Sequence, residues 1–397
     1  MTIFVPEFGF SSGTETVLLK VLPRLVSSGH AVVLAAPAYR LRRYDERGLD
    51  QRVRRVELAW PSRGWRKILH SITRRGGPEK ITRFLWQICL RDLVRRENAT
   101  HVFVPWIVDQ PVVKFGRPTA VMVMDLAWRH YPSTWFGKSP AQLDASLKHW
   151  LNHARLIFPV SDSTADELRR SFPETTGRLV SVPHGSEWKG GGIAAPGDTT
   201  DSPPFFLTPA SLTPNKNHAL LLDAAIQLWR EGQNFRLVWT GNDTAGLSSE
   251  KDSPQPEIRN LQNTIREHAG IINKRLESRG FVSDDILASL YKKTRRVVLP
   301  STYEGFGLPV LEAYERGSKV ICTDIPPFRE QMQRYLMQDH TTLIPDGDAQ
   351  ALTRALRTAL LEEQSPTPEA PADLRQRLES WTWDDAVRRY AEELGSL

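Results

Sequence analysis

The sequence predicts an α/β protein made of two domains, each built around a parallel sheet. Its 397 residues are too many for one ordinary core and suit two domains of ordinary size. Short continuous apolar strands alternate with helices along both halves, which is typical of parallel sheets covered on both faces. Residues 189–204 are rich in Gly, Pro, Ser and Thr and show no apolar periodicity. We therefore expect a linker there, between domains at 1–188 and 205–378.

The first half reads as repeated β-α units. A short apolar strand leads through a Gly/Ser loop into a helix over residues 14–28, and Gly29 and His30 then turn the chain into the next strand. The apolar strands predicted in this half are 2–5, 31–36, 102–104, 119–124 and 156–160.

The second half repeats the scheme, with helices between its strands. A Pro-rich break at residues 366–371 precedes an amphipathic helix over residues 383–394. We assign residues 379–397 to a C-terminal helix that can cross back to the first domain. The apolar strands predicted in this half are 205–207, 236–240, 297–300 and 319–322.

The composition is that of a soluble globular protein, with 40% hydrophobic and 25% charged residues. No apolar run approaches the 18 or so residues that a membrane span needs, and the first residues do not resemble a signal peptide. Cys89 and Cys322 give neither a disulfide framework nor a metal-binding spacing. These features predict a protein of the reducing cytoplasm.

The excess of positive over negative charge lies entirely in the first half. Residues 1–185 contain 28 Lys and Arg against 16 Asp and Glu, whereas the remainder contains 24 against 30. A basic half indicates a nucleic acid, an anionic membrane or an anionic substrate as partner. Nucleic acid is disfavoured because no recognition module appears in the sequence.

Residues 61–100 carry ten of these basic residues, interleaved with apolar ones that include Trp65, Phe84 and Trp86. Two interpretations stay open. A basic amphipathic helix can lie on the inner face of an anionic membrane. Alternatively, its apolar face packs on the domain and its Arg residues are solvated.

The clearest functional motif is residues 300–313, with the sequence PSTYEGFGLPVLEA, which follow an apolar strand. Gly305 and Gly307 allow the backbone to approach a ligand closely. Pro309 suits the first position of a helix, whose unpaired amides can hold an anion.

Two carboxylates flank this loop. Glu304 lies in the loop and Glu312 falls one turn into the helix, so together they can grip both ends of one ligand. The alternative is an ordinary helix start in which Glu312 simply favours the helix dipole.

This motif resembles the paired-glutamate signature of glycosyltransferase family 4. The similarity continues through residues 317–330 and 280–285, covers most of residues 200–390 well and covers the first half more loosely. The resemblance implies the GT-B fold, with two Rossmann-like domains facing across a cleft. It also implies retaining transfer of a hexose-type sugar from a GDP- or UDP-linked donor to a glycan or lipid-linked acceptor.

The resemblance further implies a role for each matching residue. Glu312 would hold the ribose hydroxyls, and Glu304 would hold hydroxyls of the donor sugar. The loop at Val282 would present backbone groups to the nucleotide base. The remaining contacts to the donor sugar and diphosphate would come from the loop residues Gly305, Phe306, Gly307 and Leu308.

A second motif covers residues 210–218, where a Pro turn places Lys216 just before a helix. A lysine there can reach a diphosphate as a point charge, although a surface lysine is usually just solvated. In family 4 the matching lysine binds the donor phosphate. Many members carry Arg where Ser211 or Asn215 stands here, so the phosphate charge would be neutralised either by Lys216 with less help or by an Arg from elsewhere.

Two motifs of the first domain are weaker. The loop before the first helix resembles the glycine-rich loop of family 4, which makes Gly13 a candidate contact to a bound sugar or phosphate. Residues 122–132 resemble a His-Asp-Leu segment followed by Pro, with Asp125 and Pro132 matching. Met124 takes the place of the His that normally contacts the donor sugar, and Arg129 or His130 is a candidate substitute.

We expect no catalytic metal and no cofactor, because no Asp-x-Asp motif follows any of the strands predicted above and Asp284-Asp285 reads as a helix cap. Lys216 and helix amides would then stabilise the leaving diphosphate. Two other hypotheses stay open. One is a different GT-B enzyme, such as a nucleotide-sugar epimerase or a soluble glycan synthase. The other, motivated by Met124, is a catalytically silent nucleotide-sugar binding protein.

Overall fold

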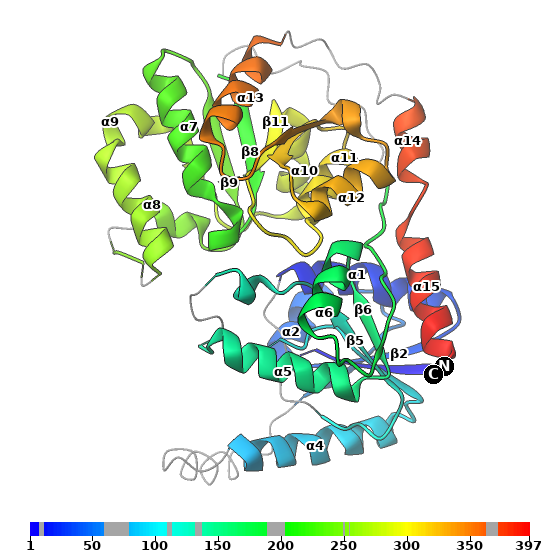
Figure 1. The fold of residues 1–397 in the computed structure, drawn as a ribbon. Helices are drawn as coiled ribbons and strands as arrows, with labels where there is room; N and C mark the ends of the chain where they lie inside the picture. Colours follow the sequence, from blue (N-terminus) through cyan, green and yellow to red (C-terminus); the bar gives the residue numbers. More distant parts are fainter. Residues whose placement is uncertain are drawn as a thin grey trace. The chain divides into compact units, whose positions relative to one another are not determined.

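The computed structural model describes residues 1–7, 12–58, 79–108, 113–131, 137–188, 203–248, 251–253, 255–362 and 372–397. The chain separates into two compact units. Unit 1 comprises Met1–Gly185 and Trp383–Leu397, and unit 2 comprises Ser186–Thr382 (Figure 1). Most of the predicted linker and the Pro-rich break at 366–371 lie outside the described residues.

Unit 1 is built on a seven-stranded sheet in the order β3-β2-β1-β4-β5-β6-β7. All neighbouring strands run parallel. The strands are β1 (Thr2–Pro6), β2 (Ala31–Ala36), β3 (Arg54–Glu57), β4 (His101–Val104), β5 (Thr119–Val123), β6 (Leu156–Pro159) and β7 (Arg178–Leu179).

Unit 2 is built on a six-stranded sheet in the order β10-β9-β8-β11-β12-β13, again with parallel neighbours throughout. Its strands are β8 (Phe205–Pro209), β9 (Arg236–Thr240), β10 (Leu276–Ser278), β11 (Arg296–Leu299), β12 (Val320–Thr323) and β13 (Thr341–Ile344).

Helices flank both sheets (Figure 1). Those of unit 1 are α1 (Ser12–Ser27), α2 (Ala38–Glu46), α4 (Glu79–Arg96), α5 (Pro140–His153), α6 (Asp162–Ser171) and α15 (Trp383–Gly395). Those of unit 2 are α7 (His218–Arg230), α8 (Pro256–Glu267), α9 (Ala269–Ile272), α10 (Asp284–Lys293), α11 (Leu308–Tyr314), α12 (Pro326–Arg334), α13 (Ala349–Leu361) and α14 (Ala372–Leu378). The prediction of two Rossmann-like α/β domains is confirmed.

Every strand predicted from the sequence is present, with ends that shift by no more than two residues. The prediction missed β3, β7, β10 and β13, which are the four edge strands of the two sheets. Central strands are buried on both faces and therefore read as continuous apolar runs. An edge strand such as β3, with the sequence Arg-Arg-Val-Glu, is half-exposed and gives no such signal.

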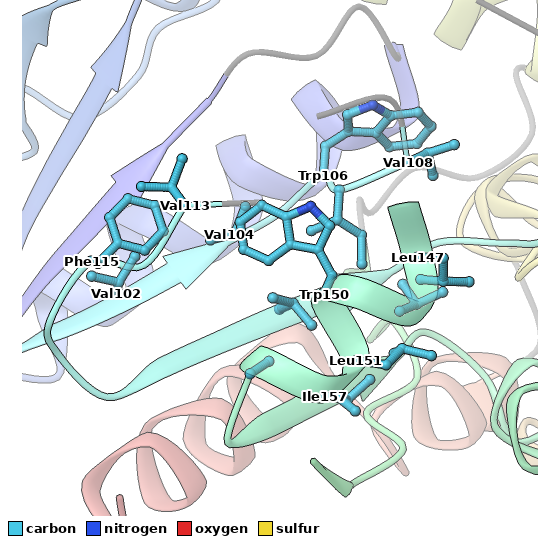
Figure 2. Packing of buried hydrophobic residues seen from close by; sticks show 14 of the residues in the cluster. Val102, Val104, Trp106, Val108, Val113, Phe115, Leu147, Trp150, Leu151 and Ile157 are labelled. Atoms are coloured by element: carbon cyan, nitrogen blue, oxygen red, sulfur yellow. The ribbon is translucent and has the colours of Figure 1, made fainter. Parts of the chain in front are cut away.

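The core of unit 1 lies between the sheet and the helices that cover it. Figure 2 shows Trp150 of α5 among aliphatic side chains, including Val104 of β4 and Leu147 of α5. All three are less than 2% exposed. Burial of such large apolar side chains fixes α5 on the sheet and, with it, the chain that follows β5.

The last helix of the chain, α15, belongs to unit 1. Tyr390 packs on Phe103 and Phe158, with ring centroids 5.8 and 4.8 Å apart. At the start of the same helix, Asp384 accepts a hydrogen bond of 2.8 Å from Arg24 of α1. Helix α15 thus completes the core of the unit that contains the N-terminus (Figure 1).

The basic stretch 61–100 is described only in part. Residues 59–78 and the side chains of 79–86 lie outside the description, and these include Trp65, Phe84 and Trp86. In the rest of α4, Leu90 and Val94 join the core of unit 1, whereas Arg95 and Arg96 are exposed. Packing on the domain therefore accounts for this part of the helix. No helix within the described ranges is long and apolar enough to cross a membrane.

Candidate functional site

The sheet of unit 2 has a topological switch point between β8 and β11. From β8 the chain continues to β9 on one side, yet the strand beside β8 on the other side is β11. Ligands of open parallel sheets bind outside the carboxyl ends of the strands at such a point, because the two following loops diverge there. These loops are residues 210–217 and 300–307, which contain most of the predicted site residues.

Lys216 and Glu304 form an ion pair across the switch point. The Lys216 Nζ donates to both carboxylate oxygens of Glu304, at 2.6 and 2.7 Å. The two side chains are only 18% and 8% exposed. The sequence predicted both residues as donor contacts, and the structure shows that they neutralise each other.

The turn that carries Lys216 is tied to the opposite loop. Asn215 donates its side-chain amide to the carbonyl of Tyr303 at 3.0 Å, and its carbonyl accepts from the amide of Thr302 at 2.9 Å. Asn217, which follows Lys216, has a left-handed φ of 49° and is the N-cap residue of α7. These two hydrogen bonds of Asn215 therefore fix the position of Lys216 at the carboxyl ends of the strands.

Ser211 lies at the other end of the same loop, beside Gly241. A Cβ on Gly241, whose φ is 128°, would lie 2.8 Å from the Ser211 amide nitrogen. Only glycine allows the loops after β8 and β9 to approach so closely. This contact places the Ser211 backbone at the strand ends.

The loop at residues 305–308 takes its shape from α12. Gly307 has a φ of 88°, and a Cβ there would lie 2.4 Å from a ring carbon of Phe328. Gln331 donates its side-chain amide to the carbonyls of Phe306 and Gly307. Because the C=O and N–H of a trans peptide point in opposite directions, the amides of Gly307 and Leu308 point away from Gln331.

Neither of these two amides has an acceptor among the described residues, so both can donate to a ligand. Helix α11 begins at Leu308, which corrects one detail of the prediction. Pro309 occupies the second helical position, not the first. Its missing N–H costs nothing there, since the first turn leaves its amides unpaired in any case.

Glu312 lies on α11 and receives a hydrogen bond from Tyr291 of α10, whose hydroxyl is 2.9 Å from Oε2. Burial raises the pKa of Tyr291 well above its usual value, and the neighbouring Glu312 carboxylate raises it further. The phenol therefore stays protonated, and Glu312 is its nearer acceptor, since the carbonyl of Pro309 lies at 3.4 Å. The sequence analysis missed Tyr291, and no sequence signal links two residues separated by a complete strand.

Val282 lies in the turn between β10 and α10 and is half-buried, next to the exposed Phe281. The carbonyl of Gly280 accepts from the Gly241 amide at 2.8 Å, which joins this turn to the loop after β9. The cap of α10 is Ser283, whose hydroxyl accepts from the Ile286 amide. The prediction that Asp284-Asp285 caps this helix was wrong by one residue.

The candidates from the first domain lie in unit 1. Residues 8–11 of the predicted glycine-rich loop and Pro132 lie outside the described residues, while Gly13 falls in the first turn of α1. Asp125 follows β5, and its Oδ1 accepts from the amide of Ala127 at 3.0 Å. Met124 packs partly buried against the core.

The two proposed substitutes for the absent histidine each face a carboxylate. Arg129 donates to Asp144 at 2.8 Å. His130 lies 2.7 Å from Glu167 through its Nε2. Both side chains therefore have a structural role in this arrangement.

The sequence analysis also missed a buried ionic network in unit 1. Arg40 donates to both oxygens of Glu7 and to Glu15, which also accepts from Arg43 and Arg47. Glu7 and Glu15 are at most 1% exposed. Arg40, Arg43 and Arg47 are spaced three and four residues apart, so they lie on one face of a helix and can reach a common partner. Within the described part of the chain, no group of three or more His, Cys, Asp or Glu is arranged to hold a metal ion.

Residues 194–380 match the sequence profile of the family "Glycosyl transferases group 1". Unit 2 belongs to this family. The matched residues include the two loops at the switch point, which follow β8 and β11. A solved structure of Anabaena Alr3699/HepE in complex with UDP-glucose has a TM-score of 0.68 at 16% identity and covers both chains fully. This likeness shows the GT-B fold.

Two curated relatives of the chain are mannosyltransferases from Escherichia coli. "Serotype-specific mannosyltransferase WbdA" is 35% identical over 132 residues, which is 33% of this chain and 15% of that protein. "O-antigen chain mannosyltransferase B" is 27% identical over 210 residues, which is 47% of this chain and 48% of that protein. The matches thus cover less than half of each relative.

Proposed function

We propose that the chain is a retaining, metal-independent glycosyltransferase that moves a hexose from a GDP- or UDP-linked donor to a glycan or lipid-linked acceptor. The placement of Lys216, Glu304 and the 305–308 loop at the switch point of a group 1 domain carries this proposal. The names of the two relatives favour mannose as the sugar and a cell-surface polysaccharide as the product.

In the proposed reaction, the bond between the sugar C1 and the diphosphate oxygen breaks, and the electron pair leaves with the nucleoside diphosphate. An acceptor hydroxyl oxygen bonds to C1 on the same face, and its proton passes to the leaving phosphate. The developing charge on that phosphate would be stabilised by the Lys216 ammonium and the amides of Gly307 and Leu308. The sugar would pass through an oxocarbenium-like transition state.

The Lys216–Glu304 pair gives this reaction a way to couple binding to chemistry. A donor diphosphate would replace Glu304 as the partner of Lys216. The carboxylate of Glu304, released from the lysine, would then accept from hydroxyls of the donor sugar. Glu312, further along α11, would accept from the ribose hydroxyls.

Labelled donors test the proposal. GDP-mannose, UDP-glucose and UDP-galactose, each labelled in the sugar, are incubated with membranes that supply lipid-linked glycans. We expect label in the acceptor from one donor, with the anomeric configuration of the donor retained in the product NMR spectrum. Interconversion of the donor sugar without an acceptor would indicate an epimerase. Tight nucleotide binding without any transfer would indicate a silent binding protein.

We also propose that unit 1 docks on the cytoplasmic face of an anionic membrane, where a lipid-linked acceptor would lie. The excess of basic residues over residues 1–185 supports this. Each basic residue near such a surface contributes about 1 kcal/mol, weakened by salt. Co-sedimentation with vesicles checks it: binding should require anionic lipid and fall with salt. Equal recovery with neutral and anionic vesicles at low salt would contradict the docking proposal.

A further inference from the structure

The carboxylate of Glu312 is held from one side only. Its Oε2 accepts from the Tyr291 hydroxyl at 2.9 Å. Its Oε1 accepts from no described residue. One oxygen is therefore fixed by the protein, while the other can accept from a ligand hydroxyl.

Tyr291 is in turn held at its ring and at its backbone. The Arg316 guanidinium lies over the ring, 4.7 Å from the centroid. The backbone carbonyl of Tyr291 accepts from the Ser318 hydroxyl at 2.7 Å. Arg316 also donates to the backbone carbonyl of Glu312 at 2.8 Å, so it joins the tyrosine and the glutamate directly.

This arrangement removes a freedom that the glutamate would otherwise have. An exposed carboxylate turns readily about its last side-chain bond, because the terminal torsion of Glu is broad. A hydrogen bond from a buried, permanently protonated phenol restricts that rotation and sets the plane of the carboxylate. Recognition of a specific pair of hydroxyls depends on such an orientation.

We propose that Tyr291 and Arg316 are positioning residues that orient Glu312 toward the ribose hydroxyls of the donor nucleotide. The inference rests on the proposed function, which gives Glu312 that ligand. Tyr291 would act through Glu312 and not by touching the donor. Its removal should therefore weaken ribose recognition specifically, and leave contacts to the diphosphate intact.

Titration calorimetry with nucleotides that differ only in the ribose measures this effect. The dissociation constants of GDP and UDP are compared with those of their 2′,3′-dideoxy forms, and the ratio of the two constants defines ribose discrimination. In Tyr291→Phe we expect the ratio to fall by about tenfold, as for loss of a hydrogen bond to a charged group. Tyr314→Phe is the matched control, because its buried hydroxyl on α11 contacts Thr341 and not Glu312. Its ratio should equal that of the wild type.

Two more variants separate positioning from a general loss of structure. In Glu312→Gln the discrimination should be largely lost, and adding Tyr291→Phe should change it no further, since both residues act on one interaction. Arg316→Lys should lower the ratio in the same direction as Tyr291→Phe. If Tyr291→Phe does not fold, Arg316→Lys decides the matter by itself.

A wild-type ratio in folded Tyr291→Phe would overturn the inference, as would a wild-type ratio in Arg316→Lys when only that variant folds. An equal fall in the Tyr314→Phe control would also overturn it, because the effect would then be general. Failure of the wild type to bind either ribonucleotide would contradict the proposed function itself, and the inference with it. Nucleotide binding with full discrimination in every Tyr291 and Arg316 variant would contradict the inference alone.

Discussion

The two units share one architecture but arrange charge differently beyond the carboxyl ends of their strands. In both sheets the first six strands in order follow the same pattern, so β1 and β4 correspond to β8 and β11. Beyond β1 and β2, two buried carboxylates are paired with three arginines, of which Arg40 is also buried. Beyond β8 and β11, charge is carried by the single pair Lys216–Glu304 and by Glu312, which has one uncommitted oxygen.

The difference shows how one framework serves two purposes. A network in which each carboxylate has at least one arginine is costly to break, because any survivor would be a buried unpaired charge. A single pair at the rim of the strands can exchange partners with an anionic ligand. The network of unit 1 therefore favours rigidity, whereas the Lys216–Glu304 pair of unit 2 can exchange partners.

The largest expected effect comes from removing Arg40. Arg40→Met leaves Glu7, which is fully buried, without its bidentate hydrogen-bond partner. We expect a loss of about 3–5 kcal/mol in the free energy of unfolding of unit 1. Urea denaturation followed by tryptophan fluorescence measures it. Arg169→Met, which removes an exposed ion pair, is the control and should change stability by less than about 1 kcal/mol. Equal stability of the two variants would contradict the rigid role of the network.

Removal of Lys216 or of Glu312 should lower activity much more than stability. Lys216→Met should lower kcat/KM by about 10²–10³-fold, by analogy with removal of a group that stabilises transition-state charge. Glu312→Ala should also lower kcat/KM, because it removes the proposed contacts to the ribose hydroxyls. Both variants should still fold, although Lys216→Met leaves Glu304, which is 8% exposed, without its partner and should lower the melting temperature. Lys274→Met, an exposed lysine of the same unit, is the control and should keep full activity. A near-normal kcat/KM in either variant would contradict its assignment.

Acid should weaken both units through one buried histidine each. Burial lowers the pKa of His184 in unit 1 and of His218 in unit 2 to about 3. Between about pH 6.5 and 3 the unfolded chain binds a proton that each folded histidine does not. The free energy of unfolding should therefore fall with decreasing pH, by about 1.4 kcal/mol per pH unit and histidine.

Urea titrations between pH 6.5 and 4.5 check this, with His218→Gln compared with the wild type. The variant should show a shallower loss of stability in acid, while other groups contribute equally to both proteins. Identical pH slopes would show that His218 does not stay neutral in the folded unit.

The smallest expected effect is that of a chelator. With no metal in the proposed reaction, excess EDTA should leave the transfer rate within about twofold of its original value, since Lys216 and the loop amides stabilise the leaving charge. Loss of activity that Mn²⁺ or Mg²⁺ restores would contradict a metal-independent mechanism.

The sequence predicted the central part of each sheet and failed at the edges, for one physical reason. A central strand must be apolar on both faces, and this leaves a continuous run such as Ala31–Ala36. The edge strand β10, with the sequence Leu-Glu-Ser, is half-exposed along its whole length and looks like a loop. Strand prediction from apolar runs therefore stops one strand short at each edge.

The functional residues likewise divide into those that a local sequence motif indicates and those that only the packing reveals. Lys216, Glu304 and Glu312 belong to motifs that are continuous in sequence, so their types and spacing indicated a site. Tyr291 and the Arg40 network depend on packing between elements that are distant in sequence. Nothing local distinguishes Tyr291 from any other apolar-face residue of a helix. The pairing of Lys216 with Glu304 was likewise beyond the motifs, because it depends on β8 lying beside β11.

Hydrogen–deuterium exchange with and without nucleotide tests whether the donor binds at the switch point of unit 2. GDP and UDP are each added at saturating concentration, and exchange is followed along the chain. We expect the better-binding nucleotide to protect residues 211–217 and 300–312 of unit 2. Exchange at residues 31–47 should stay unchanged, because the charges there are already paired. Protection of residues 31–47 with none at 300–312 would contradict the assignment of the donor site to unit 2.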